Sequence, residues 1–153
     1  MNWFSVNSIA ENAYFVAGIL QVFVIAVLIV QQIYAKKDRV RREDEIAINL
    51  CKEYLVDLHK EIDSSFTQWA SNQNNSLQNT KECIHIINRM EVISLFFTKG
   101  IATSQIGKEM IGELYVDHIM KLQKYLEEKQ SISKTEFEKS FRGCYELINL
   151  WKK

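Results

Sequence analysis

An otherwise apolar stretch of the chain contains four polar side chains that could do chemistry: His85, Asn88, Arg89 and Glu91. On a helix, residues three and four apart share a face, so His85, Asn88 and Arg89 would lie together. Such a cluster could bind an anion or the carboxylate of a partner. The alternative is an edge between helices, where the charge pairs with Glu82 or Glu91. We favour this alternative because structural ion pairs outnumber functional sites.

Other patterns that support catalysis or metal binding are incomplete. A ribonuclease of the helical HEPN type needs a histidine four to six residues after an arginine, and no arginine here has one. Cys83 and His85 lie two residues apart, but no second Cys or His pair completes a metal site. The glycines match no phosphate-binding fingerprint. A Cys–His nucleophile at Cys51 or Cys144 stays open, although nothing singles it out. We expect no catalytic residue, no metal and no cofactor.

The charge balance excludes a typical nucleic-acid-binding protein. The chain has 19 basic and 19 acidic residues, and its formal net charge is zero. Nucleic-acid binding domains usually carry a clear basic excess. The three cysteines all follow the basic residues at positions 36–42. We expect this part of the chain to lie in the cytoplasm, where thiols stay reduced. Their odd number and wide spacing predict no disulfide framework.

Residues 14–34 read YFVAGILQVFVIAVLIVQQIY and contain no charge. As a helix this segment is about 31 Å long, which matches the hydrocarbon core of a bilayer. A cleaved signal peptide would carry its positive charge before the apolar run, whereas only Glu11 is charged there. We therefore predict a transmembrane helix at residues 14–34, preceded by an extracytoplasmic N-terminus at residues 1–13.

Five basic residues follow this segment directly: Lys36, Lys37, Arg39, Arg41 and Arg42. The positive-inside rule places this side in the cytoplasm, so we expect residues 35–153 to form a cytoplasmic domain. The same side chains are expected to bind anionic lipid headgroups, at about 1 kcal/mol each.

Gly18 and Gln21 lie three residues apart, on one face of the predicted transmembrane helix. A small residue permits close approach of a second helix, and a polar residue can form a hydrogen bond across the contact. The two residues therefore indicate a contact between copies of the chain or a surface facing a pore. A single glutamine tolerated on a strongly apolar helix is an equally good interpretation.

The remaining residues contain no proline, which favours helices. Apolar side chains at three- and four-residue steps predict a helix from residue 36 to 71 that continues the transmembrane helix. Residues 71–80 are polar and predict a loop. Three further helices are expected at about residues 80–100, 104–129 and 133–151. The predicted fold class is all-α, with an N-terminal transmembrane helix that continues into a cytoplasmic bundle of about four helices.

Local signals mark the ends of these helices. Thr80 is the expected N-cap of the second helix and Gly100 its C-cap. Gly107 and Gly112 weaken the third helix, which could break there. The last helix should begin at Ser133 or Thr135, with a glutamate three residues later as capping-box partner.

The segment Ile87-Asn88-Arg89-Met90-Glu91, followed by an aliphatic run to Phe97 and by Gly100, resembles an uncharacterised bacterial single-pass membrane family, domain of unknown function 4760. This resemblance implies a bacterial inner-membrane protein with one N-terminal membrane helix, a basic helix beside the membrane and a helical domain. In its layout the chain is also similar to small membrane accessory proteins of bacterial CRISPR and antiphage systems, some of which assemble into pores.

These patterns lead to a functional expectation. The first interpretation is a membrane-anchored protein without catalytic activity, which self-associates and acts on an unknown protein partner. Its other partner is membrane lipid, and no nucleic acid is expected. The alternative is an antiphage or CRISPR-accessory effector whose oligomer forms a pore and depolarises the membrane. An enzyme is the third interpretation.

Overall fold

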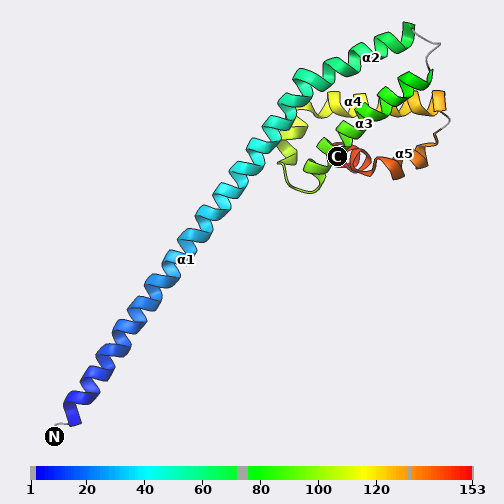
Figure 1. The fold of residues 1–153 in the computed structure, drawn as a ribbon. Helices are drawn as coiled ribbons and strands as arrows, with labels where there is room; N and C mark the ends of the chain where they lie inside the picture. Colours follow the sequence, from blue (N-terminus) through cyan, green and yellow to red (C-terminus); the bar gives the residue numbers. More distant parts are fainter. Residues whose placement is uncertain (1–2, 72–75, 131, 153) are drawn as a thin grey trace. The chain divides into compact units, whose positions relative to one another are not determined.

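The structure is a computed structural model that describes residues 3–71, 76–130 and 132–152 (Figure 1). The regular structure of these residues is helical throughout, which confirms the all-α prediction. The chain divides into two units, residues 1–41 and 42–153. The elements are helix α1 (Trp3–Glu53), π-helix η1 (Tyr54–Leu58), α2 (His59–Ser71), α3 (Ser76–Thr98), α4 (Ser104–Gln130), α5 (Lys134–Ser140) and α6 (Arg142–Trp151).

The described residues of the first unit belong to α1, and every side chain described there is exposed. Large apolar side chains from Val16 to Ile33 are solvent-exposed, and several, such as Phe23, exceed half of their full exposure. The most apolar window of this helix has a mean hydropathy of 2.3, and 0% of it is buried. Among the described residues, this is the one helix long and apolar enough to span a membrane.

The second unit is a helical bundle with one apolar core. Helix α3 packs against α2, α4 and α6, as expected for the central helix. The expected bundle of about four helices is confirmed, because α5 and α6 together cover the predicted last helix. The largest fully buried side chains come from every one of its long segments: Tyr54, Leu58, Ile62, Ile86, Ile87, Met90, Tyr115, Ile119, Leu122, Leu126, Phe137 and Leu147.

Helix α3 begins earlier than predicted. It starts at Ser76, so Asn79 and Thr80 are inside the helix, and the prediction of Thr80 as N-cap is wrong. Both side chains are only 5% exposed, and the Thr80 hydroxyl accepts a hydrogen bond from Gln130 Nε2 at 2.9 Å. This tertiary contact occupies a side chain that otherwise competes for backbone hydrogen bonds. Residues 72–75 of the predicted loop lie outside the described residues.

The C-terminal end of α3 is as predicted. Gly100 has a φ of +68°, the left-handed conformation that favours glycine. Its N–H donates to Phe97 O at 3.3 Å, and the N–H of Ile101 donates to Phe96 O at 3.0 Å. These two bonds form a Schellman motif, which satisfies the last carbonyls of the helix.

Helix α4 does not break at its glycines. It is continuous from Ser104 to Gln130. A Cβ atom on Gly107 would lie 2.6 Å from Phe97 Cε1 and 2.8 Å from Trp151 Cζ2. The absence of a side chain therefore lets two aromatic rings pack directly on the backbone. Glycine lowers the helix propensity of this segment, and the packing of the two rings offsets that cost.

The last predicted helix is divided in two. It begins as expected, since Ser133 and Glu136 form a capping box. The division lies at Phe141, whose φ of −124° and ψ of 57° are not helical. The first N–H groups of α6 therefore need acceptors from elsewhere in the fold.

The long helical path from α1 to α2 contains one wide turn. The N–H of His59 donates to the carbonyl of Tyr54, a spacing of five residues that defines the π-helix η1. The predicted helix over residues 36–71 is thus correct as a path but not as a uniform α-helix. The wider turn brings residues five apart towards one face, and the rings of Tyr54 and His59 have centroids 6.4 Å apart.

Candidate functional site

The four polar residues expected to form one cluster have different surroundings. Arg89 forms an ion pair with Glu61 of α2. The expectation that its charge pairs with Glu82 or Glu91 is therefore wrong. His85 and Asn88 are exposed on the surface of α3. The indole Nε1 of Trp69 donates to Glu82 at 3.2 Å, which gives that carboxylate a different partner.

Glu91 supplies the acceptors that α6 needs. Its Oε1 accepts from the backbone N–H of Gly143 at 2.7 Å, and its Oε2 accepts from that of Cys144 at 2.8 Å. A carboxylate at a helix N-terminus also interacts favourably with the helix dipole. A Cβ atom on Gly143 would lie 2.8 Å from Glu91 Oε1, so glycine permits this approach. Glu91 therefore acts as a cap that ties α3 to α6.

The residues assigned to lipid and to self-association lie on α1. Lys36, Lys37, Arg39, Arg41 and Arg42 are all exposed. Gln21 is exposed, and a Cβ atom built on Gly18 would meet nothing within 4 Å. This face of the helix is therefore open to a second helix, and the roles assigned to these residues stay predictions.

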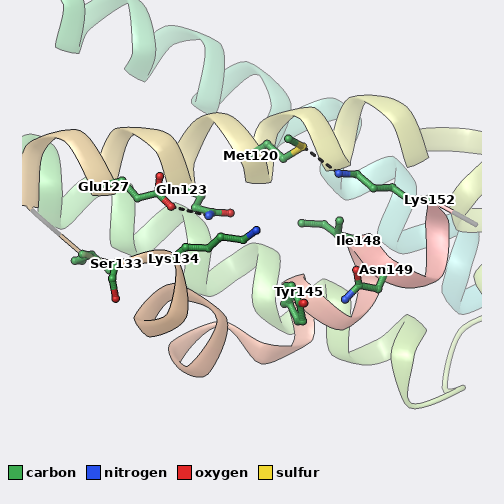
Figure 2. A pocket seen from close by; sticks show the side chains of 10 residues that line it. Met120, Gln123, Glu127, Ser133, Lys134, Tyr145, Ile148, Asn149 and Lys152 are labelled. Carbon is green, nitrogen blue, oxygen red and sulfur yellow. Dashed lines mark hydrogen bonds between the residues drawn. The ribbon is translucent and has the colours of Figure 1, made fainter.

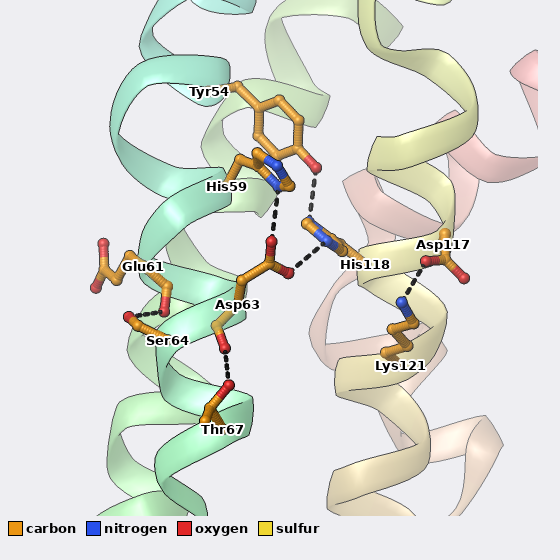
Figure 3. A network of polar contacts seen from close by, with 9 residues as sticks. All are labelled: Tyr54, His59, Glu61, Asp63, Ser64, Thr67, Asp117, His118 and Lys121. Atoms are coloured by element: carbon orange, nitrogen blue, oxygen red, sulfur yellow. Dashed lines mark hydrogen bonds and ion pairs between the residues drawn. The ribbon is translucent and has the colours of Figure 1, made fainter.

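A different cluster joins α2 to α4 (Figure 3). Asp63 Oδ2 lies 3.6 Å from His59 Nδ1, and Asp63 Oδ1 lies 3.5 Å from His118 Nε2. On its other side, His118 Nδ1 is hydrogen-bonded to the Tyr54 hydroxyl at 2.8 Å. The two imidazole rings stack, with centroids 5.2 Å apart and planes inclined by 24°.

Burial controls the protonation of this cluster. His118 is 2% exposed, and burial lowers its pKa, although the nearby Asp63 carboxylate acts in the opposite direction. Burial, assisted by Asp63, raises the pKa of Tyr54. At neutral pH the cluster therefore presents a neutral imidazole next to a protonated phenol. The Nδ1 atom of His59 is buried and has no hydrogen-bond partner.

Only part of this cluster could be recognised from the sequence. His59 and Asp63 are four residues apart, which places them on one face of a helix. His118 is far away in the chain, and Tyr54 joins the group through the π-turn. Only the packing of α2 against α4 brings these side chains together.

The cysteines are poor candidates for the nucleophile that the sequence left open. Cys51 and Cys144 are buried, each at 0% exposure. Burial raises the pKa of Cys51 to about 11, and it also raises the pKa of Cys144. Reactive cysteines have the opposite character, with a lowered pKa and partial exposure.

The bundle also has an open groove between α4 and α6 (Figure 2). Two pairs of its lining side chains contact each other: Gln123 donates to Glu127 at 2.7 Å, and Lys152 lies 3.5 Å from the sulfur of Met120. The groove therefore resembles a solvated surface more than the convergent polar set of a ligand site.

No known protein family, curated protein or solved structure matches this chain. What the chain does is therefore inferred from its own exposed apolar helix and from the side chains of its bundle. The resemblance to the single-pass membrane family stays a prediction based on its short motif around Arg89.

Proposed function

We propose that the protein is a bacterial inner-membrane protein with a single transmembrane helix at residues 14–34 and a cytoplasmic binding domain. The observation that supports this proposal is the exposure of the most apolar window of α1, of which 0% is buried. Soluble monomers seldom leave so large an apolar surface uncovered. A lipid bilayer covers such a helix on all sides.

The length and the energetics of the segment fit this role. It spans about 31 Å, close to the thickness of the hydrocarbon core. Its Leu, Ile, Phe and Val side chains together favour insertion by about 4 to 8 kcal/mol. Gln31 and Gln32 reduce this insertion free energy only slightly, because they lie near the membrane interface. The exposed basic residues from Lys36 to Arg42 favour an orientation with the N-terminus outside.

The bundle acts by binding rather than by catalysis, and the anchor brings copies of the chain together. Gly18 and Gln21 mark the face that we assign to this self-association. Within lipid, the open space beside Gly18 allows close backbone approach. The Gln21 side chain then finds a hydrogen-bond partner on the second helix, which removes the cost of an unpaired polar group in hydrocarbon.

Oxidative crosslinking of the variant Gln21→Cys tests this assignment. The three native cysteines are buried, so they contribute little background. We expect a disulfide-linked dimer in membranes containing Gln21→Cys. At 100° per residue, Phe23 lies on the opposite face of the helix, and Phe23→Cys is the matched control. It should give much less dimer under the same conditions.

Equal crosslinking of Gln21→Cys and Phe23→Cys, or monomer alone with both, contradicts the assigned face.

Membrane potential measured in the same cells separates the anchor from the pore-forming alternative. A binding protein leaves the potential unchanged on overexpression. Loss of potential that Gln21→Leu abolishes would favour the pore instead.

A further inference from the structure

We propose that His59, Asp63 and His118 form a binding site for a divalent transition-metal ion of the zinc class. Among the described residues, these three form a group of His, Cys, Asp or Glu side chains that could hold one metal ion. Their ligand atoms all lie within 4.8 Å of one another. The site lies between α2 and α4, with His118 buried and Asp63 exposed (Figure 3). It does not depend on the proposed membrane anchor or on self-association.

The distances suit tetrahedral coordination. With ligand bonds of about 2.0–2.1 Å, neighbouring ligand atoms around Zn²⁺ are about 3.3 Å apart. Asp63 Oδ2 lies 3.6 Å from His59 Nδ1, and the other oxygen, Oδ1, lies 3.5 Å from His118 Nε2. Each separation is close to this value, and each is also too long for a good hydrogen bond. A set with one oxygen and both nitrogens lies within 4.8 Å, so small side-chain adjustments would complete the geometry. An ion between the three groups would give each of them a direct partner.

A second observation concerns the hydrogen bonding of His59. Its Nδ1 atom is buried, faces Asp63 and forms no hydrogen bond. Buried polar atoms in folded proteins are nearly always paired, so an orphaned nitrogen needs an explanation. Coordination through Nδ1 satisfies it. The π-turn at η1 sets the position of this ring next to Tyr54.

Tyr54 acts on His118 as a positioning residue. Metal-binding histidines usually hydrogen-bond through the nitrogen that does not face the ion, which fixes the tautomer and the ring orientation. Here the Tyr54 oxygen lies 2.8 Å from His118 Nδ1. When Nδ1–H donates to that oxygen, the lone pair of Nε2 is directed towards Asp63 and the ion.

The donor set determines which ions fit. Two imidazole nitrogens and one carboxylate suit Zn²⁺ and its first-row neighbours, whereas Mg²⁺ and Ca²⁺ prefer sites made of oxygen. The Asp63 side chain is 60% exposed, so an ion can enter from solvent. Three protein ligands also leave a fourth position for water, as in open zinc sites.

Calorimetric titration of the full-length protein tests the proposal. The protein is purified in detergent without a polyhistidine tag, freed of metal with a chelator, and titrated with Zn²⁺ or with Mg²⁺. We expect one Zn²⁺ per chain with micromolar or tighter affinity, a higher Tm when Zn²⁺ is bound, and no comparable binding of Mg²⁺. Absence of saturable Zn²⁺ binding by the wild-type protein overturns the proposal.

Four variants assign the binding to this cluster. His59→Gln and Asp63→Asn each remove a ligand at a position with solvent access, and we expect each to weaken Zn²⁺ binding by more than about tenfold. Tyr54→Phe should weaken it by about tenfold through loss of the bond to His118. The control is His85→Gln, because His85 is the one histidine of this three-histidine chain outside the cluster. Equal binding by the control and the ligand variants contradicts the site.

Discussion

Replacing Val24 and Ile25 together with lysine is expected to release the protein from the membrane fraction into the soluble fraction. Both side chains are more than half exposed near the middle of the apolar segment, at 58% and 57%. A lysine at the centre of a transmembrane helix costs about 2.5 to 3.5 kcal/mol, so two lysines cost about 5 to 7 kcal/mol. The lost contributions of Val24 and Ile25 add about 1 kcal/mol, which gives a total of about 6 to 8 kcal/mol. That loss is as large as the insertion free energy of the whole segment. Cell fractionation followed by immunoblotting measures the result.

The matched control carries leucine at both positions. Val24→Leu and Ile25→Leu keep the segment apolar, so this protein should remain with the membranes. If the double-lysine protein also stays in the membrane fraction, the apolar segment is not what holds the chain there. If both proteins are soluble, the proposed anchor is wrong.

The second large effect is expected for Glu91→Ala, which should lower the free energy of unfolding of the bundle by about 3 kcal/mol. Hydrogen bonds to a charged group contribute about 1.5 to 3 kcal/mol each, and Glu91 accepts two, from Gly143 and Cys144. The variant leaves both donors without a side-chain acceptor at the start of α6. For a domain of this size the Tm should fall by roughly 10 °C, measured by circular dichroism.

Two further variants make this measurement specific. Glu91→Gln keeps the shape and one acceptor oxygen, so it should lose less stability than Glu91→Ala. Glu113→Ala removes an exposed glutamate from α4 and should change the Tm little. A Glu91→Ala protein as stable as Glu113→Ala contradicts the role of Glu91 as the cap of α6.

Features set by neighbours in the chain could be predicted from the sequence. Gly100 ends α3 because a left-handed residue favours glycine, and Ser133 with Glu136 begins α5 because the two reach each other over one turn. The apolar segment of α1 is also evident from composition. In each case the residues that decide the structure lie within one helical stretch.

Features set by distant residues could not be predicted. Thr80 lies inside α3, where its hydroxyl accepts a hydrogen bond from Gln130, and Arg89 pairs with Glu61 across two helices. After the division at Phe141, the carboxylate of Glu91 accepts from the first N–H groups of α6. The sequence gives no sign of which elements will meet, so local rules alone gave the wrong cap and the wrong ion pair.

The cluster of His59, Asp63 and His118 shows the same limit. The pair on α2 has helical spacing, but many His and Asp pairs do, and most are ordinary surface contacts. Only the position of α4 adds His118, and only the π-turn adds Tyr54. A prediction of this site therefore needed the packing of the bundle as well as the order of the residues.

Labelling with a membrane-impermeant maleimide tests the central claim, that α1 crosses the inner membrane with the bundle inside the cell. The variants are Ser8→Cys, before the apolar segment, and Lys129→Cys, at an exposed position of α4. The native cysteines are buried and should react little. In intact spheroplasts the account predicts labelling of Ser8→Cys alone, with Lys129→Cys labelled only after lysis. Protection of both cysteines until lysis, or labelling of Lys129→Cys in intact spheroplasts, would contradict it.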